Sequence, residues 1–391
     1  MTHRYVESPV SFFELSEKYP DEESAVAYFE AKRWPDGAYC PDCGSTSVYD
    51  CKAKRKVRLW KCKDCGEQFT VTSGTVMEST KLPLRKWLFA FHMLGGAKKG
   101  LSSRYLARQL GITLKSAWHL SHRIRATMKE DGQYFQGGTV ETDETYIGGR
   151  RKKVGRGYRK NKIAVQTIVE RRHSKGPGKG SGRHRVSGTS ECVNECPGRA
   201  QTIALNPDEG KVDGRTVGAN LRKHTDPATT RLMTDESPIY DRVGESFKSH
   251  ETVNHKKEEY ARTDPMTGRL VSTNAAEGLF ANLKRQINGT HHSTSKKHLP
   301  RYLEEFDYKY NTREQSDTER TEAAIGQIEG RRVTLFKTAA GGDSLHDRKQ
   351  GEKTKHGTRR GWHAKKHGRK GVRKGTRYDG GSDGTPTGGG G

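Results

Sequence analysis

The chain has 391 residues, a formal charge of +25 and an apolar fraction of 30%. This length allows two or three domains, and the excess of Lys and Arg predicts a polyanionic partner. No apolar run is long enough to span a membrane, and the N-terminus lacks the apolar segment of a signal peptide. We therefore expect a cytoplasmic protein without membrane contact, whose seven cysteines bind metal rather than form disulfides.

Residues 1–33 are expected to form an N-terminal helical segment, and a zinc ribbon is predicted over residues 34–80. Two Cys-x-x-Cys pairs lie 18 residues apart, and residues 57–61 and 68–72 alternate like short strands. A two-residue gap lets both thiolates of a pair reach one ion. Four thiolates close the coordination of zinc, so this Zn²⁺ should stabilise the fold without catalysing a reaction. The predicted zinc ligands are Cys40, Cys43, Cys62 and Cys65, and Cys51 is expected to lie outside the site.

Residues 81–130 are predicted to contain a helix-turn-helix. Residues 102–110 have helical periodicity, residues 111–113 form a glycine-containing turn, and residues 114–128 form a second helix with a basic face. In this motif the second helix enters the major groove of DNA. Helical hairpins that bind nothing share the outline, and the basic surface and the adjoining ribbon favour DNA binding. The candidate DNA contacts on the second helix are Lys115, His119 and Arg123.

From about residue 136 the pattern changes from helices to strands, which indicates a second, α/β domain. Three strands, a helix, a further strand and later helices match a ribonuclease-H-like mixed sheet flanked by helices. We place this domain at residues 136–325, with an insertion at about 172–199. The predicted strands cover residues 139–147, 162–169, 200–205 and 230–234, and the helices residues 214–223, 274–286 and 299–311.

Three acidic residues, Asp143, Asp235 and Glu277, lie at the end or edge of apolar stretches of this domain. Any one of them alone is best explained as a surface residue. Three carboxylates gathered together repel one another unless cations neutralise them. Two oxygen-liganded cations about 3.5–4 Å apart are what in-line phosphoryl transfer uses. The set therefore predicts a Mg²⁺ or Mn²⁺ site, and Lys284, nearly two turns beyond Glu277, shares its helix face and can reach a DNA phosphate.

Further basic residues follow this helix. They are expected to contact the phosphate backbone of DNA, although the histidines among them could also ligate metal or transfer protons. Residues 340–391 are rich in Gly, Lys, Arg and His. They are predicted to be a disordered tail that attracts DNA nonspecifically. The candidate contacts in this region are Lys284, Arg285, His291, His292, Lys296 and Lys297.

Ordered motifs between about residues 34 and 313 resemble the DDE transposases of prokaryotic insertion sequences. The closest likeness is to the group with an N-terminal zinc ribbon and an ISXO2-like catalytic domain. The resemblance implies binding to terminal inverted repeats, metal-dependent strand cleavage and joining of 3′ ends to target DNA. It also implies a nucleoid-associated enzyme that acts as a homodimer or larger synaptic assembly, because two ends are handled together. The motifs are residues 143–149 (DETYIGG), 234–236 (TDE), 253–255 (VNH), 273–277 (TNAAE), 283–285 (LKR), 289–302 (GTHHSTSKKHLPRY), 305–306 (EF) and 311–313 (NTR).

Several alternatives remain open. The family's third catalytic position is either Asn or Glu, so Asn274 competes with Glu277, and we favour Glu277 because a carboxylate ligates Mg²⁺ better than an amide. Cys192 and Cys196 in the insertion are too few ligands for a second metal site. A transposase-derived DNA-binding regulator, or a nuclease that cuts without joining, would share much of this sequence pattern.

Overall fold

The computed structural model describes residues 10–51, 57–131, 135, 137–148, 162–173, 195–205, 212–257, 259–264 and 270–334. All of these belong to one unit of the chain, Met1–Asp347. The predicted tail at 340–391 and most of the predicted insertion at 172–199 lie outside the described residues. None of the described helices is both long enough and apolar enough to cross a membrane.

The N-terminal region consists of two capped helices and a small antiparallel sheet. Ser11 and Asp21 each accept a hydrogen bond from the backbone amide three residues on, which fixes the start of each helix. The sheet has the order β1-β2-β3 and contains a first strand that was not predicted. The elements are α1 (Phe12–Lys18), α2 (Glu22–Arg33), β1 (Val48–Asp50), β2 (Trp60–Cys62) and β3 (Gln68–Phe69).

Three further helices follow: α3 (Leu84–Gly96), α4 (Ser103–Leu110) and α5 (Leu114–Thr127). The short connection between α4 and α5 turns at Gly111, whose φ of +57° is a left-handed conformation that suits glycine. Thr113 caps α5 by accepting a hydrogen bond from the amide of Ser116. Apolar side chains of α2 to α5 share one core with the small sheet. α4 and α5 therefore form a tight helical hairpin that is held by its neighbours.

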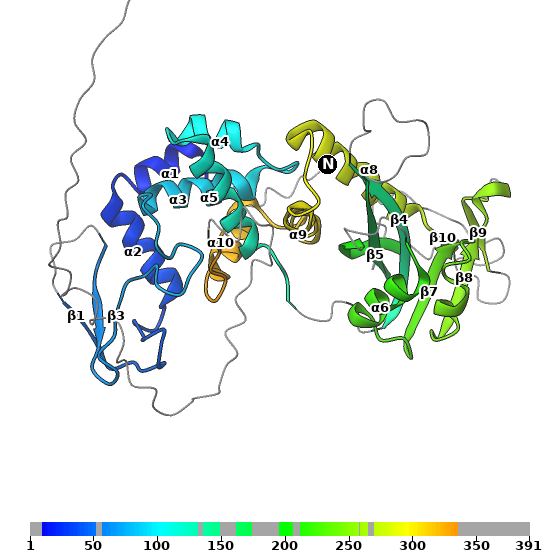
Figure 1. The fold of residues 1–391 in the computed structure, drawn as a ribbon, viewed down its shortest axis with the longest axis horizontal. Coiled ribbons are helices and arrows are strands. Elements are labelled where there is room, and N and C mark those ends of the chain that lie inside the picture. The colour runs from blue at the N-terminus through cyan, green and yellow to red at the C-terminus, as the bar shows by residue number, and fades with distance from the viewer. Residues whose placement is uncertain are drawn as a thin grey trace, which may run out of the picture. The chain divides into compact units, whose positions relative to one another are not determined.

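A mixed five-stranded sheet forms the centre of the α/β region, in the order β6-β5-β4-β7-β8 (Figure 1). β4 pairs antiparallel with β5 and β5 with β6, whereas β4, β7 and β8 run parallel to one another. β9 and β10 pair with each other in a separate two-stranded antiparallel sheet. The strands are β4 (Gly138–Ile147), β5 (Ile163–His173), β6 (Glu195–Leu205), β7 (Thr230–Asp235), β8 (Ser249–Val253), β9 (Ala261–Thr263) and β10 (Leu270–Ser272).

Helices cover both faces of the five-stranded sheet. Strand side chains alternate between the faces, so Val165 of β5 packs with α8 and α9, whereas Ala164 packs with α6 and α7. Both faces of the central strands are therefore covered, although these strands also carry buried polar side chains, such as Glu141 of β4 and Gln166 of β5. The helices of this region are α6 (Gly214–His224), α7 (Asp241–Gly244), the 3₁₀ turn η1 (His255–Lys257), α8 (Asn274–Gln286), the π-helical turn η2 (Ile287–His291) and α9 (Leu299–Asn311).

After α9 the chain returns to the N-terminal core. α10 (Asp317–Gly326) contributes Ala324 and Ile325 to the same apolar cluster as α2 and α3. Beyond α10, the amide of Val76 donates to the carbonyl of Ile328 over 2.9 Å, and that of Gly330 donates to the carbonyl of Gly74 over 2.9 Å. The N-terminal core thus includes residues from both ends of the described chain.

Candidate active site and zinc centre

The four predicted zinc ligands lie together. Their sulfur atoms all lie within 4.8 Å of one another, and no other group of three or more metal-ligating side chains in the described ranges meets that limit. The Sγ atoms of Cys40 and Cys65 are 3.6 Å apart, as are those of Cys43 and Cys62. Disulfide sulfurs would be about 2.05 Å apart, whereas tetrahedral zinc with Zn–S bonds of about 2.3 Å separates sulfurs by about 3.8 Å. The cluster therefore fits a structural zinc, and Cys51 is outside it.

Two of the predicted catalytic acids come from neighbouring parallel strands. β4 and β7 pair in register up to Glu141 and Met233. Continuing that register by two residues places Asp143 beside Asp235, the last residue of β7. The third acid, Glu277, lies in the first turn of α8, the helix that packs on the face of β4 to which Asp143 and Ile147 belong. Two strands and one helix thus bring the three acids to one side of the sheet.

The charges of Asp235 and Glu277 act on Asp143. The pKa of Asp143 is raised to about 6, first by burial and then by the charges of Asp235 and Glu277, against a hydrogen bond from the Glu144 amide. Mutual repulsion of this kind is what a bound cation relieves. The donor set consists of carboxylate oxygens, which suits Mg²⁺ or Mn²⁺. Their oxygens do not all fall within the 4.8 Å limit that the cysteines meet.

His255 is a neighbour of this site that the sequence did not assign. Its Nε2 lies 2.9 Å from the hydroxyl of Thr273 and 3.8 Å from a carboxylate oxygen of Glu277. Its charge, when present, lowers the pKa of Asp143. The Val-Asn-His motif drew attention to this histidine in the sequence. Its neighbours in the sequence did not indicate that it would lie beside Glu277.

Glu144 and Tyr240 form a second unassigned pair beside the acids. The hydroxyl of the fully buried Tyr240 donates to the carboxylate of Glu144. The pKa of Glu144 is raised to about 7, mainly by burial and also by the charges of Asp143 and Asp235, against the hydrogen bond from Tyr240, which lowers it. Consecutive strand residues point to opposite faces, so Glu144 lies on the other face of β4 from Asp143.

The remaining residues predicted on α8 differ in position. Asn274 is the first residue of the helix and is exposed, as are Lys284 and Arg285 near its other end. Arg285 donates to the backbone carbonyl of Ala281 and to the side chain of Asn282. Glu277 and Lys284 are seven residues apart on one regular helix, so they share a face.

The predicted DNA contacts on α5 divide into exposed and buried residues. Lys115, in the first turn, is exposed. His119 is half-buried, and burial lowers its pKa to about 4. Arg123 is 5% exposed, its guanidinium lies 4.9 Å from the Trp87 ring, and it donates to the backbone carbonyl of Glu78 over 2.7 Å. Arg123 is thus engaged inside the protein.

The basic residues after α8 also differ in exposure. His292 and Lys297 are exposed, whereas Lys296 is half-buried. His291 lies in the π-helical turn with its ring 4.5 Å from that of Tyr302, and burial lowers its pKa to about 4. A neutral imidazole packed on an aromatic ring contributes little to phosphate binding by charge.

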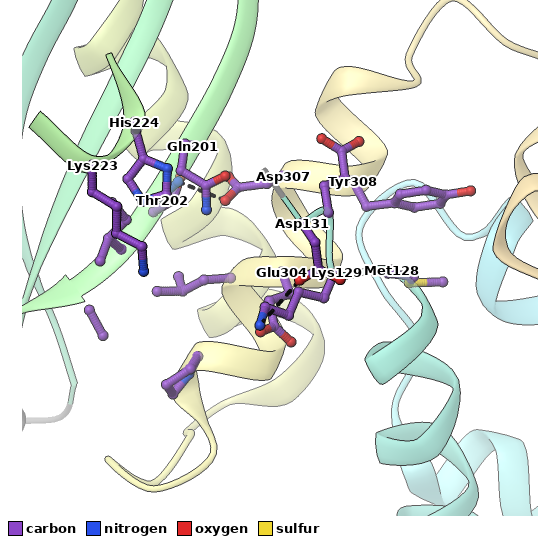
Figure 2. Close-up of a pocket in the computed structure, with 15 residues that line it drawn as sticks. Met128, Lys129, Asp131, Gln201, Thr202, Lys223, His224, Glu304, Asp307 and Tyr308 are labelled. Carbon is purple, nitrogen blue, oxygen red and sulfur yellow. Dashed lines mark hydrogen bonds and ion pairs between the residues drawn. The ribbon is translucent and has the colours of Figure 1, made fainter. Parts of the chain in front are cut away.

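A cavity of about 320 Å³ is lined by residues of α9, β6 and α6 and by residues 128–131 (Figure 2). None of the predicted catalytic residues lines it. Figure 2 shows Asp307 directed at β6, where it accepts a hydrogen bond from the Thr202 amide over 2.6 Å, and Glu304 beside Lys129. Burial raises the pKa of Asp307 well above its usual range and that of Glu304 to about 7.

Comparisons with known proteins match two domains of the chain and a protein of a transposable element. Residues 136–311 match the ISXO2-like transposase domain, and residues 20–68 match the transposase zinc-ribbon domain. The chain is also 26% identical over 304 residues to an uncharacterized protein in transposable element ISH50 of Halobacterium salinarum, covering 74% of this chain and 90% of that protein. The zinc ribbon, the mixed sheet that carries the acids and these matches together show that the chain belongs to the insertion-sequence transposases that combine a zinc ribbon with an ISXO2-like domain.

Proposed function

We propose that the protein is a DDE transposase that binds the terminal inverted repeats of its element, cleaves DNA there and joins the 3′ ends to target DNA. The family membership supports a DNA-processing enzyme. The observation that carries the proposal is the position of three carboxylates at one side of the sheet, on β4, β7 and α8, where the charges of Asp235 and Glu277 help to raise the pKa of Asp143.

In this proposal Asp143, Asp235 and Glu277 hold two Mg²⁺ or Mn²⁺ ions. Bound cations of this kind activate an attacking oxygen and stabilise the leaving oxygen in phosphoryl transfer. The protein's own residues place the scissile phosphate. Lys284, exposed on the Glu277 face of α8, contacts a neighbouring phosphate, and His255 orients Glu277 through the contact of 3.8 Å.

The same proposal gives a role to the five-stranded sheet and to the α4–α5 hairpin. The order β6-β5-β4-β7-β8, with three antiparallel strands continued by two parallel ones, supports a ribonuclease-H-like catalytic domain. The tight α4–Gly111–α5 hairpin supports a helix-turn-helix that reads the inverted repeat with the exposed first turn of α5. Both ends of the element are held by a homodimer or larger assembly.

End cleavage and joining by the purified full-length protein test this function. The substrate is a labelled duplex with the DNA end that flanks the gene, incubated with Mg²⁺ and a second duplex. We expect 3′-end nicking and joining by wild type and by Asn274→Ala. In Asp235→Asn and Glu277→Gln we expect a loss of about 10²- to 10³-fold, the size found when one group that stabilises transition-state charge is removed.

Other outcomes identify other functions. Cleavage without joining would point to a nuclease on the same fold. Binding to the ends without cleavage by wild type would point to a DNA-binding regulator. Loss of joining in Asn274→Ala, with activity kept in Glu277→Gln, would move the third catalytic position to Asn274.

A further inference from the structure

A buried ion pair between β4 and β5 also contacts the helix that carries Glu277. Glu141 lies two residues before Asp143 on β4 and therefore on the same face of the strand. Its carboxylate is fully buried, and one oxygen accepts a hydrogen bond from Arg171 Nε of β5 over 2.5 Å. The second oxygen accepts hydrogen bonds from the amides of Ala275 and Ala276 over 2.8 and 3.1 Å.

These two amides are among the first-turn donors of α8, which have no partner within the helix. Thr273, the residue before the helix, makes no side-chain cap. A carboxylate from another strand therefore supplies the cap, where the positive end of the helix dipole favours a negative charge. The cap lies one or two residues from Glu277 in sequence, so it determines where the first turn of α8 sits on β4.

Arg171 extends the contact to the strand that enters α8. Its Nη1 donates to the carbonyl of Leu270 over 2.9 Å, and its Nη2 donates to the hydroxyl of Ser272 over 2.5 Å. Both acceptors belong to β10, which ends immediately before the helix. The pair thus holds the chain on each side of Thr273, from β10 through the first turn of α8.

A charged pair is a costly way to fill a protein interior, because apolar residues of similar volume often give equal or greater stability. Here both partners also bond to the segment that leads to Glu277. Arg171 donates to one backbone carbonyl of that segment, and Glu141 accepts from two of its backbone amides. Side chains that hold metal ligands in place commonly change metal affinity or activity 10- to 100-fold when altered. A displacement of about 1 Å at a catalytic group has effects of that size.

We propose that Glu141 and Arg171 are positioning residues that set the location of Glu277 relative to Asp143 for divalent-cation binding, by fixing β10 and the first turn of α8 to β4. This inference rests on the proposed function. It assigns to the pair no contact with DNA or with the reacting atoms.

The test compares full-length Glu141→Gln with Glu251→Gln as a matched control. Glu251 pairs with Arg231 between β7 and β8 of the same sheet, and its side chain is 14% exposed. For Glu141→Gln we expect faster hydrogen exchange in peptides covering residues 270–280, and Mn²⁺ binding, followed without DNA, weakened roughly 10-fold or more. We also expect kcat for end cleavage to fall about 10- to 100-fold while KM for the DNA end stays within about twofold. Glu251→Gln should match wild type in all three measurements.

Zinc content and thermal midpoint establish that each variant is folded. Glu141→Asp is the second variant: it keeps the negative charge but withdraws the carboxylate from the α8 amides, and it should shift the same measurements in the same direction. Unchanged Mn²⁺ affinity and kcat in a folded Glu141→Gln would overturn the proposal, even if hydrogen exchange rose, because the pair would then be structural only. If wild type has no Mn²⁺ site that Asp143→Asn removes, the proposed function itself fails, which is a different result from equal binding by wild type and Glu141→Gln.

Discussion

Arg125 of α5 and Glu305 of α9 form a fully buried ion pair, with 2.6 Å between Nε and the carboxylate oxygen. Lys309, one turn further along α9, contacts the other oxygen of Glu305 over 2.5 Å. The two cations hold the pKa of Glu305 well below its usual range in spite of its burial. The helix proposed to read DNA is therefore tied, through one carboxylate, to a helix that covers the catalytic sheet.

Removing that carboxylate is expected to destabilise the protein severely. Glu305→Ala leaves two buried cations without their shared partner, and breaking a buried pair in this way costs about 3–5 kcal/mol. The midpoint of urea unfolding, followed by tryptophan fluorescence, measures the effect. Glu322→Ala is the control, since its pair with Lys32 is 44% and 38% exposed and such pairs contribute about 1 kcal/mol or less. Equal midpoints for the two variants would contradict the prediction.

Zinc removal should unfold the ribbon. We expect one Zn²⁺ per chain in wild type and Cys51→Ser, and loss of bound zinc in Cys62→Ser, because three thiolates leave the tetrahedral site open. Elemental analysis of the purified proteins measures the zinc content. Loss of zinc from Cys51→Ser would show that the cluster of Cys40, Cys43, Cys62 and Cys65 is not the zinc centre.

Stability should fall as the pH rises through neutrality. Burial raises the pKa of Glu304 to about 7 in the folded protein, against about 4.3 in an unfolded chain. The folded state therefore holds this proton more tightly. Its contribution, about 4 kcal/mol at most, is fully present below the unfolded pKa and is lost as the pH rises through about 7.

Urea unfolding at pH 5.5 and pH 8 measures this dependence. Glu304→Gln cannot lose a proton, so its stability should change less between the two pH values than that of wild type. Glu314→Gln, at an exposed residue just beyond α9, should behave as wild type does. A steeper fall in Glu304→Gln than in wild type would refute the assignment to this residue.

Lys115 should contribute one phosphate contact to DNA binding. Lys115→Ala is expected to weaken binding to the element end and to reduce the slope of log K against log salt by about one. Lys18→Ala, at an exposed residue that ends α1, should leave both quantities unchanged. Fluorescence anisotropy of labelled duplexes over a series of salt concentrations measures both. An unchanged slope in Lys115→Ala would place the DNA elsewhere than on the first turn of α5.

Local sequence signals predicted much of the chain well. The helix at 299–311 was expected from its apolar stripe and the helix at 274–286 from the order of elements. Both begin and end in the structure at the expected residues, Leu299 to Asn311 and Asn274 to Gln286. Paired Cys-x-x-Cys motifs sufficed for the zinc cluster because each pair is local and only one long-range contact was needed. The strand β1 was missed, and the predicted strands at residues 57–61 and 68–72 are short in the structure, at Trp60–Cys62 and Gln68–Phe69.

Partners distant in sequence could not be predicted. The second helix of the hairpin has a basic sequence, which suggested a DNA-facing surface, yet Arg125 pairs with a residue 180 positions away. Arg123 is buried against Trp87 for a similar reason. Glu141, which caps α8 from 134 positions away, appears in the sequence only as an acid two residues before Asp143. Composition reports charge, but only packing determines whether a charge faces solvent or a buried partner.

The return of the chain to the N-terminal core has a consequence for synthesis. Residues 328–330 pair with residues 74–76, and α10 completes a core begun by α2 and α3. During translation the ribbon and the helical hairpin emerge first, but the residues that finish their core emerge some 250 positions later. Contacts of such long separation form late in folding. The N-terminal region, which is proposed to bind DNA, therefore completes its core only after the five-stranded sheet has been synthesised.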